Sequence, residues 1–246
     1  MYTHNRTSTT GTLRQTFLAP LICILAVGCD SGQATPKDPP DSNKPETKAP
    51  AQQAPEDDGL PKAEELLAKS VEALGGDKLD TLKAVYSEST VDMKAMGLHG
   101  TAKTWWHGNS FYGDSEIGGV GRTRIGGTLG KKIWSDDPIH GLRDLSGREA
   151  EQAGWSSSIC MPCTWKQHFK SAKTTKVDDT RAEITLTSES GDEMILAIDL
   201  KTYLPLSQSF KQASPLGDTP VTVGFEDYRE IDGIQMAHRQ RVHASI

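Results

Sequence analysis

Residues 84–94 read A-V-Y-S-E-S-T-V-D-M-K, and apolar and polar side chains alternate along them. Successive side chains of an extended chain point to opposite faces. Val85, Val91 and Met93 therefore share one face, while Tyr86 lies on the other. Such alternation predicts a strand of an antiparallel sheet that has one face on a core and the other toward water.

The same period of two recurs along most of the remaining chain. Residues 101–107 place Thr104 and Trp106 on one side of a strand and Trp105 on the other. Short polar turns separate such segments, and Asp232–Gly233 has the composition of a hairpin turn before the last strand. We predict further strands in residues 131–138, 181–187, 193–200, 204–210 and 221–229.

Helical signals precede and interrupt the strands. Residues 61–76 begin with Pro, carry leucines at helical spacing and end in Gly75–Gly76, which predicts a first helix. A short second helix is expected from Asp77. Ser146 and Glu149 have the spacing of a capping box, so a helical insertion begins there.

The order helix, strands, helical insertion, strands is typical of an α+β domain. We expect a single domain in residues 61–246, in which one large antiparallel sheet is covered on one face by helices.

The N-terminus has the composition of an export signal. Arg6 and Arg14 supply a positively charged region before an apolar stretch, residues 17–27, that is too short to span a bilayer as a permanent helix. The stretch closes with A-V-G before Cys29, which resembles a bacterial lipoprotein cleavage site, where the cysteine sulfur receives a lipid. An ordinary signal-peptidase site is the alternative. We expect a signal peptide in residues 1–28 and lipidation of Cys29.

Residues 29–60 are rich in Pro, Lys, Asp, Ser and Ala and have no apolar periodicity. Such a composition cannot bury enough apolar surface to offset its ordering entropy, so a disordered tether is expected. The mature chain should be lipid-anchored to a bacterial membrane in the cell envelope and face the periplasm or the exterior.

Cys160 and Cys163 stand two residues apart in S-I-C-M-P-C-T-W. A redox role would require the first cysteine at a helix N-terminus, and we expect the pair at the frayed end of the helical insertion instead. A metal site could include His168 and Met161, but it lacks the four ligands that zinc prefers. Export favours a disulfide between the two cysteines, while the redox and metal alternatives stay open.

Catalysis is not indicated by the residue types or their spacing. The histidines are dispersed, and none stands with Ser or Cys in a recognisable nucleophile arrangement. Asp136 and Asp137, which precede Pro138, have the composition of a turn. The net charge of −6 and the scattered basic residues do not form a nucleic-acid footprint. We expect a non-enzymatic protein with no catalytic residue, metal or cofactor and no nucleic-acid partner.

Four stretches carry a family resemblance: E-A-L-G-G at 72–76, I-G-G-V-G-R-T-R-I-G-G at 117–127, I-W-S-D-D-P-I-H-G-L-R-D-L-S-G at 133–147 and F-E-D-Y-R-E-I-D-G-I at 225–234. Together they resemble the bacterial exported domains related to outer-membrane lipoprotein-sorting proteins of the LolA/LolB type. The resemblance implies a strongly curved antiparallel sheet, an incomplete β-barrel, whose helices cover an apolar cavity. In that family the cavity holds acyl chains of lipoproteins.

The resemblance therefore implies a membrane-anchored protein that binds a lipid or a lipoprotein acyl chain between the sheet and the helices. Two alternatives are a thiol- or metal-binding envelope protein that uses Cys160 and Cys163, and an envelope sensor or interaction module without lipid cargo. Apolar side chains expected to face inward could line a cavity or fill a dry core. They are Val91, Met93, Trp106, Trp134, Met194, Leu196, Ile198, Phe225 and Met236.

Overall fold

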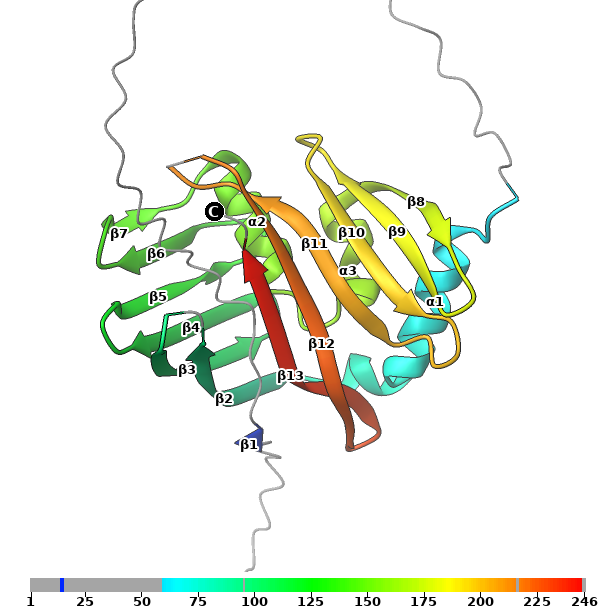
Figure 1. Ribbon diagram of the computed structural model, residues 1–246, viewed down its shortest axis with the longest axis horizontal. Helices are drawn as coiled ribbons and strands as arrows, with labels where there is room; N and C mark the ends of the chain where they lie inside the picture. The colour runs from blue at the N-terminus through cyan, green and yellow to red at the C-terminus, as the bar shows by residue number, and fades with distance from the viewer. Residues whose placement is uncertain (1–13, 16–58, 95, 216, 245–246) are drawn as a thin grey trace, which may run out of the picture.

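The computed structural model describes residues 14–15, 59–94, 96–215 and 217–244 (Figure 1). The predicted signal peptide and tether lie outside these residues, Cys29 included, except for Arg14 and Gln15 of the former and Gly59 and Leu60 of the latter. Within the described ranges, no helix is both long and apolar enough to cross a membrane.

Two sheets contain all the strands of the described chain (Figure 1). Sheet A holds β2 to β7 in sequence order, and sheet B holds β8 to β13, also in sequence order. The strands of sheet A are β2 (Ala84–Met93), β3 (Leu98–His107), β4 (Ser110–Ile117), β5 (Gly121–Thr128), β6 (Ile133–Asp137) and β7 (Gly141–Asp144). Those of sheet B are β8 (Phe169–Val177), β9 (Arg181–Ser188), β10 (Glu193–Asp199), β11 (Pro205–Gln212), β12 (Thr219–Ile231) and β13 (Ile234–Ala244).

Neighbouring strands in both sheets are antiparallel, as the sequence predicts. A two-residue segment, β1 (Arg14–Gln15), pairs in parallel with β2 at the edge of sheet A. The strands form two sheets rather than the single sheet expected, because two helices separate β7 from β8. The sheets do not close into a barrel, so the fold is α+β with an incomplete, helix-covered barrel.

The first helix matches its prediction closely. α1 (Ala63–Leu74) ends at Gly75, whose φ of 141° and the φ of 53° at Gly76 are conformations that favour glycine. A 3₁₀ helix, η1 (Gly76–Thr81), follows where a short helix was expected. The predicted hairpin turn is also present, since Asp232 and Gly233 both have positive φ between β12 and β13.

The helical insertion differs from its prediction at two points. α2 (Gly147–Ser156) begins after Ser146 as expected, but the Ser146 side chain makes no cap hydrogen bond. A separate helix, α3 (Met161–His168), then follows. Cys160 is its N-cap residue and Pro162 lies in its first turn, where proline is tolerated. The expectation that the cysteine pair lies at a frayed helix end is therefore wrong.

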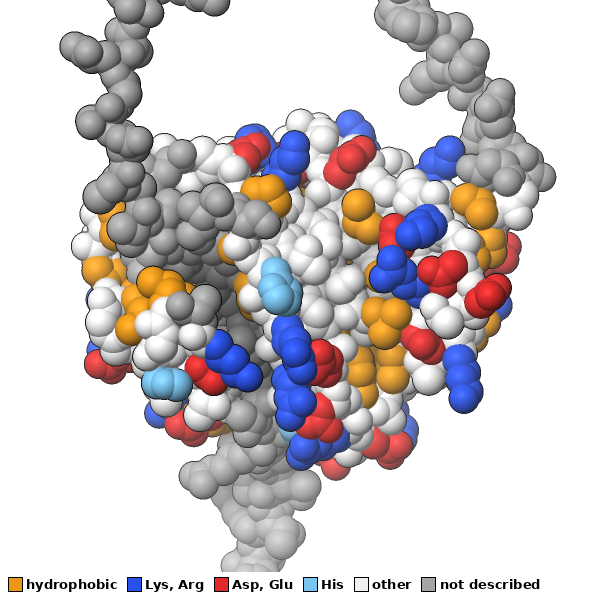
Figure 2. Space-filling model, in the orientation of Figure 1, with side chains coloured by type: hydrophobic (Ala, Val, Ile, Leu, Met, Phe, Trp, Pro, Cys, Tyr) orange, Lys and Arg blue, Asp and Glu red, His pale blue; other side chains and the backbone are white. Residues whose placement is uncertain are grey.

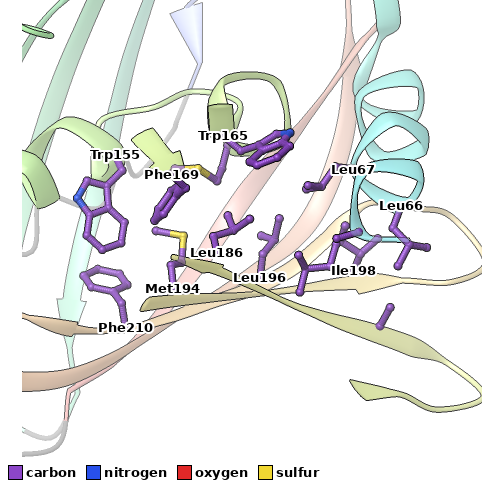
Figure 3. Packing of buried hydrophobic residues seen from close by; sticks show 14 of the residues in the cluster. Leu66, Leu67, Trp155, Trp165, Phe169, Leu186, Met194, Leu196, Ile198 and Phe210 are labelled. Atoms are coloured by element: carbon purple, nitrogen blue, oxygen red, sulfur yellow. The ribbon is translucent and has the colours of Figure 1, made fainter. Parts of the chain in front are cut away.

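The main core lies between sheet B and the helices (Figure 3). Trp155 of α2 packs edge-on against Phe169 with ring centroids 4.8 Å apart, and its ring lies 5.6 Å from that of Phe210. Met194 of β10 is fully buried beside them. Large apolar side chains thus cover much of the inner face of sheet B and pack against α2 and α3.

Candidate functional site

Two cavities lie between the inner faces of the sheets and the helices. Cavity 1, of about 120 Å³, is bounded by sheet A, α2 and the β11–β12 loop. Cavity 2, of about 110 Å³, is bounded by sheet B, the first turn of α3 and the end of α1. Trp106 and Ser156 line both cavities, so the two spaces meet at the Trp106 side chain.

Trp106 is held in place by a hydrogen bond to the end of α2. Its indole Nε1 donates to the carbonyl oxygen of Ser157 at 2.6 Å. In the sheet it is paired with Val85 of β2 and Phe111 of β4, both of which are buried. The indole is thereby positioned as a partition between the cavities.

The inner face of sheet A is smaller and more polar than that of sheet B. Its inward-facing residues form three rows, each made of residues that are register partners on neighbouring strands. From the first row to the third the side chains become more polar. The first row, in register order, is Val85, Trp106, Phe111, Gly127 and Ile133. The second is Ser87, Thr104, Gly113, Ile125, Ser135 and Arg143. The third is Ser89, Ala102, Ser115 and Thr123. Most of the second row and Thr123 of the third row line cavity 1.

Charged residues gather where cavity 1 meets β7 and α2. Arg143 donates two hydrogen bonds of 2.8 Å to the carboxylate of Glu149. Glu149 therefore pairs with Arg143 and not with the backbone of Ser146 as a capping box would require.

Asp137 forms the turn that the sequence predicts before Pro138. Its Oδ1 accepts hydrogen bonds from the backbone N–H groups of Ile139, at 3.0 Å, and His140, at 2.9 Å, and lies 3.1 Å from His140 Nδ1. Partial burial acts to raise the pKa of Asp137, but the donors from His140 and Ile139 together outweigh it and hold the pKa below its usual value. Asp137 and His140 both line cavity 1.

The β11–β12 loop over cavity 1 is fastened by Gln152, a fully buried residue of α2. Its Nε2 donates to the carbonyl oxygen of Lys211 at 3.0 Å and to Asp192 Oδ2 at 3.1 Å. Its Oε1 accepts a hydrogen bond of 2.7 Å from the backbone N–H of Ala213. Arg148, one turn earlier, binds Asp192 and also Asp218 of the loop. Sequence patterns gave no indication of this contact, because a buried glutamine has no characteristic spacing.

The nine expected cavity residues occupy four kinds of position, the last of which holds Trp134 alone. Trp106, Leu196, Phe225 and Met236 line cavity 2, and Trp106 also lines cavity 1. Met194 and Ile198 are fully buried in the packed core on sheet B. Val91 and Met93 are half-buried on β2, on the inner-facing side of the strand, beyond the residues that line either cavity.

Trp134 lies on the opposite face of sheet A from the cavities. It is opposite Gly126 in the register, and its ring centroid is 6.1 Å from that of Tyr112. Trp105 continues this row at 5.3 Å from Tyr112, and Tyr86 follows at 5.2 Å from Trp105. The expectation of an inward Trp134 is thus corrected, because aromatic residues occupy both faces of sheet A.

Cys160 and Cys163 have their Cα atoms 5.2 Å apart and are joined as a disulfide. Cys160 lines cavity 2, whereas Cys163 is exposed. His168, at the other end of α3, was considered as a metal ligand with them. Among the described residues, no group of three or more His, Cys, Asp or Glu side chains could hold a metal ion.

Charged side chains of both signs cover the outer strands of sheet B (Figure 2). A line of basic side chains follows β12 and β13, with acidic side chains beside it (Figure 2). Arg239 and Arg241 of β13 both pair with Glu226 of β12, at 3.8 and 2.7 Å. One carboxylate thus serves two guanidinium groups on this face.

No protein-family model matches the chain, and none of the curated proteins matches it. Among solved structures, it is similar to a DUF1329 family protein from Desulfovibrio piger, with 15% identity and a TM-score of 0.47 over 75% of this chain and 87% of that one. It is also similar to a LolA superfamily protein from Nitrosomonas europaea, with 14% identity and a TM-score of 0.47 over 76% and 87%.

Proposed function

We propose that this chain is an exported, lipid-anchored protein that binds a hydrophobic ligand, a lipid or a lipoprotein acyl chain, between its sheets and helices. The observation that carries the proposal is the pair of cavities that meet at Trp106. Ligand sites in proteins are typically concave, mostly apolar and supplied with a few polar groups, which is the composition found here.

The size of the cavities indicates how the ligand would enter. An engineered apolar cavity of about 150 Å³ holds benzene, and sites for larger ligands measure roughly 300–1,000 Å³. Cavities of about 120 and 110 Å³ are each too small for an acyl chain. A chain would need both, joined by displacement of the Trp106 indole from the Ser157 carbonyl oxygen.

Binding can be tested with N-phenyl-1-naphthylamine, a dye that fluoresces in apolar sites. Ala237 lines cavity 2 on β13, so Ala237→Phe places a ring in the space that the ligand would use. Ala84→Phe adds the same ring at an exposed position of β2 and serves as the control. The proposal expects Ala237→Phe to lose most of the dye signal while Ala84→Phe retains it. Equal signals from the two variants would overturn the proposal, provided that circular dichroism shows both to be folded.

The anchor is tested separately in cells. Cys29→Ala should move the protein from the membrane fraction to the soluble fraction, because the acceptor of the lipid is removed. Cys23→Ala, which changes a cysteine inside the predicted signal peptide, should leave the protein in the membrane fraction. Membrane retention of Cys29→Ala would contradict the anchor without bearing on ligand binding.

A further inference from the structure

The disulfide between Cys160 and Cys163 lies at the start of a helix, and not at the frayed helix end that the sequence suggested. Cys160 is the N-cap residue of α3, and Cys163 follows Pro162 in the first turn. The backbone N–H groups of Cys163 and Thr164 donate to the Cys160 carbonyl oxygen at 3.0 and 3.2 Å, so the helix begins directly after Cys160. The partial positive charge at a helix N-terminus stabilises a thiolate. The structure therefore has the feature whose expected absence argued against a redox role.

The positive end of α3 has no carboxylate of its own to neutralise it. Its first turn contains no acidic side chain, whereas α1 has Glu64 and Glu65 in the first turn and α2 has Glu149. Among the described residues that line cavity 2 beside Cys160, none is charged, and Tyr228 is the only other titratable side chain. Burial raises the pKa of Tyr228 above its ordinary value, so the phenol stays neutral. Neither the first turn of α3 nor the cavity wall thus opposes a negative charge on the Cys160 sulfur.

The two cysteines differ in their access to solvent. Cys163 is exposed, whereas Cys160 is half-buried on the wall of cavity 2. An external thiolate therefore has access to Cys163, and the Cys160 sulfur becomes the leaving group. Thiol–disulfide exchange is faster when the leaving thiol has the lower pKa, and the N-cap position favours the thiolate of Cys160.

Cavity 2 can accept the Cys160 side chain once the bond is broken. Its volume of about 110 Å³ gives the side chain room to turn away from Cys163. Ser156 lines the same cavity, and its buried Oγ has no hydrogen-bond partner within the described part of the chain. A serine hydroxyl can donate to a thiolate. The reduced state of the pair therefore has both space and a donor beside it.

We propose that Cys160 and Cys163 form a redox-active centre that exchanges its disulfide with a dithiol. A thiolate of the dithiol attacks Cys163 Sγ, the bond between the two cysteines breaks, and its electron pair leaves on Cys160 Sγ. The second thiolate of the dithiol then attacks the dithiol's own sulfur in the mixed disulfide and releases Cys163 as a thiolate. The dithiol is oxidised to a disulfide. Its two electrons pass to the cysteine pair, and its two protons go to the new thiols or to solvent. This inference goes beyond the proposed function and does not rest on it.

The site of attack is tested with glutathione, a monothiol that has no second thiol to resolve the mixed disulfide. The full chain is mixed with reduced glutathione, and the reaction is stopped early with excess N-ethylmaleimide. Peptide mass spectrometry should find glutathione on Cys163 and maleimide on Cys160. Glutathione mainly on Cys160, or equally on both cysteines, would overturn the proposal.

Reducibility is tested by equilibrating the same chain in glutathione buffers. Structural disulfides of secreted proteins resist reduction by glutathione, whereas labile and catalytic disulfides equilibrate with it. The pair should change from oxidised to reduced as the ratio of reduced to oxidised glutathione rises, which the mass added by N-ethylmaleimide measures. A pair that stays oxidised at every ratio would overturn the proposal.

The role of the helix N-terminus is tested at Ile159, the exposed residue that precedes Cys160. Ile159→Asp places a carboxylate next to the N-cap, so the equilibrium constant for reduction should fall about threefold, the effect of one charge at a helix end. Ile159→Asn has nearly the same shape without the charge and should keep the parental constant. Circular dichroism checks that both variants are folded. Equal constants for the two variants would overturn the proposal, because a merely structural disulfide does not respond to a charge beside the N-cap.

Discussion

Trp105 and Trp106 are neighbours in the sequence and lie on opposite faces of sheet A. Trp106 faces the cavities and donates its indole N–H to the Ser157 carbonyl oxygen. Trp105 is 37% exposed and packs between Tyr86 and Tyr112 on the outer face. Trp106 therefore borders the cavities, whereas Trp105 belongs to the outer aromatic row. Comparing substitutions at the two positions distinguishes a change in the cavities from a change on the outer face of the sheet.

Trp106→Ala should join the two cavities. The variant should lower the unfolding free energy by about 3 kcal/mol, the cost of removing a large apolar side chain. This is the low end of the range for tryptophan, because Trp106 is only half-buried. The affinity for N-phenyl-1-naphthylamine should rise, since the partition between the cavities is removed. Urea unfolding and dye titration measure the two effects.

Trp105→Ala is the matched control, and it should cost less stability and leave dye affinity unchanged. If Trp106→Ala weakened dye binding, the indole would be a wall of the binding site and not a partition within it.

Gln152→Leu should loosen the β11–β12 loop without changing the apolar core. The variant leaves the Ala213 N–H and the Lys211 carbonyl oxygen without their partner, at a cost of about 3 kcal/mol. Hydrogen exchange at the Ala213 amide should be faster than in the parent protein. Gln167→Leu, at an exposed position on α3, should change neither quantity. Unchanged protection of Ala213 would show that the salt bridges of Arg148 suffice to hold the loop.

The alternation of side chains predicted the strands well, because its period is a local property. It assigned Trp105 and Trp106 to their correct faces. It could not place Trp134, because Ile133 and Trp134 are both apolar and the period gives no preference between them. The face is set by the partner strand: a Cβ at Gly126 would lie 3.1 Å from Trp134 Cζ2, so the absence of a side chain there makes room for the indole on the outer face.

The buried hydroxyl groups on the inner face of sheet A could not be predicted either. The alternation rule assigns apolar residues to the buried face of a strand, so it does not predict the buried Ser87, Ser89 and Ser135. Buried serines are more frequent in sheet A than in sheet B. The helix α3 was missed for a related reason. Pro162 was read as an interruption, but a proline in the first turn costs no helical hydrogen bond.

Stability should fall as the pH decreases below neutrality, partly through His168. Burial lowers the pKa of this imidazole below its ordinary value of 6.5, although Glu151 acts in the opposite direction. Below pH 6.5 the unfolded chain binds a proton that the folded chain does not, so the unfolding free energy decreases until the folded pKa is reached. Above pH 6.5 the imidazole is neutral in both the folded and the unfolded chain, so His168 does not contribute to the pH dependence of the unfolding free energy.

His168→Gln should flatten this decrease when urea unfolding is measured between pH 7.5 and roughly 5. Part of the slope should remain, since burial and Arg229 also lower the pKa of His238. Gln167→Leu, which changes an exposed and non-titratable residue of α3, is the control and should keep the parental slope. A parental slope in His168→Gln would mean that the imidazole titrates alike in the folded and unfolded chains.

The disulfide between Cys160 and Cys163 should contribute little to stability. It closes a loop that contains only two intervening residues, and short loops remove little entropy from the unfolded chain, at most about 2 kcal/mol. The double variant Cys160→Ser/Cys163→Ser should therefore remain folded, with an unfolding free energy lower by that amount or less. The parent protein treated with dithiothreitol should show the same value, and dithiothreitol should not affect the double variant. A larger loss would mean that the bond also fixes the first turn of α3 against cavity 2, in which case dye binding should weaken together with stability.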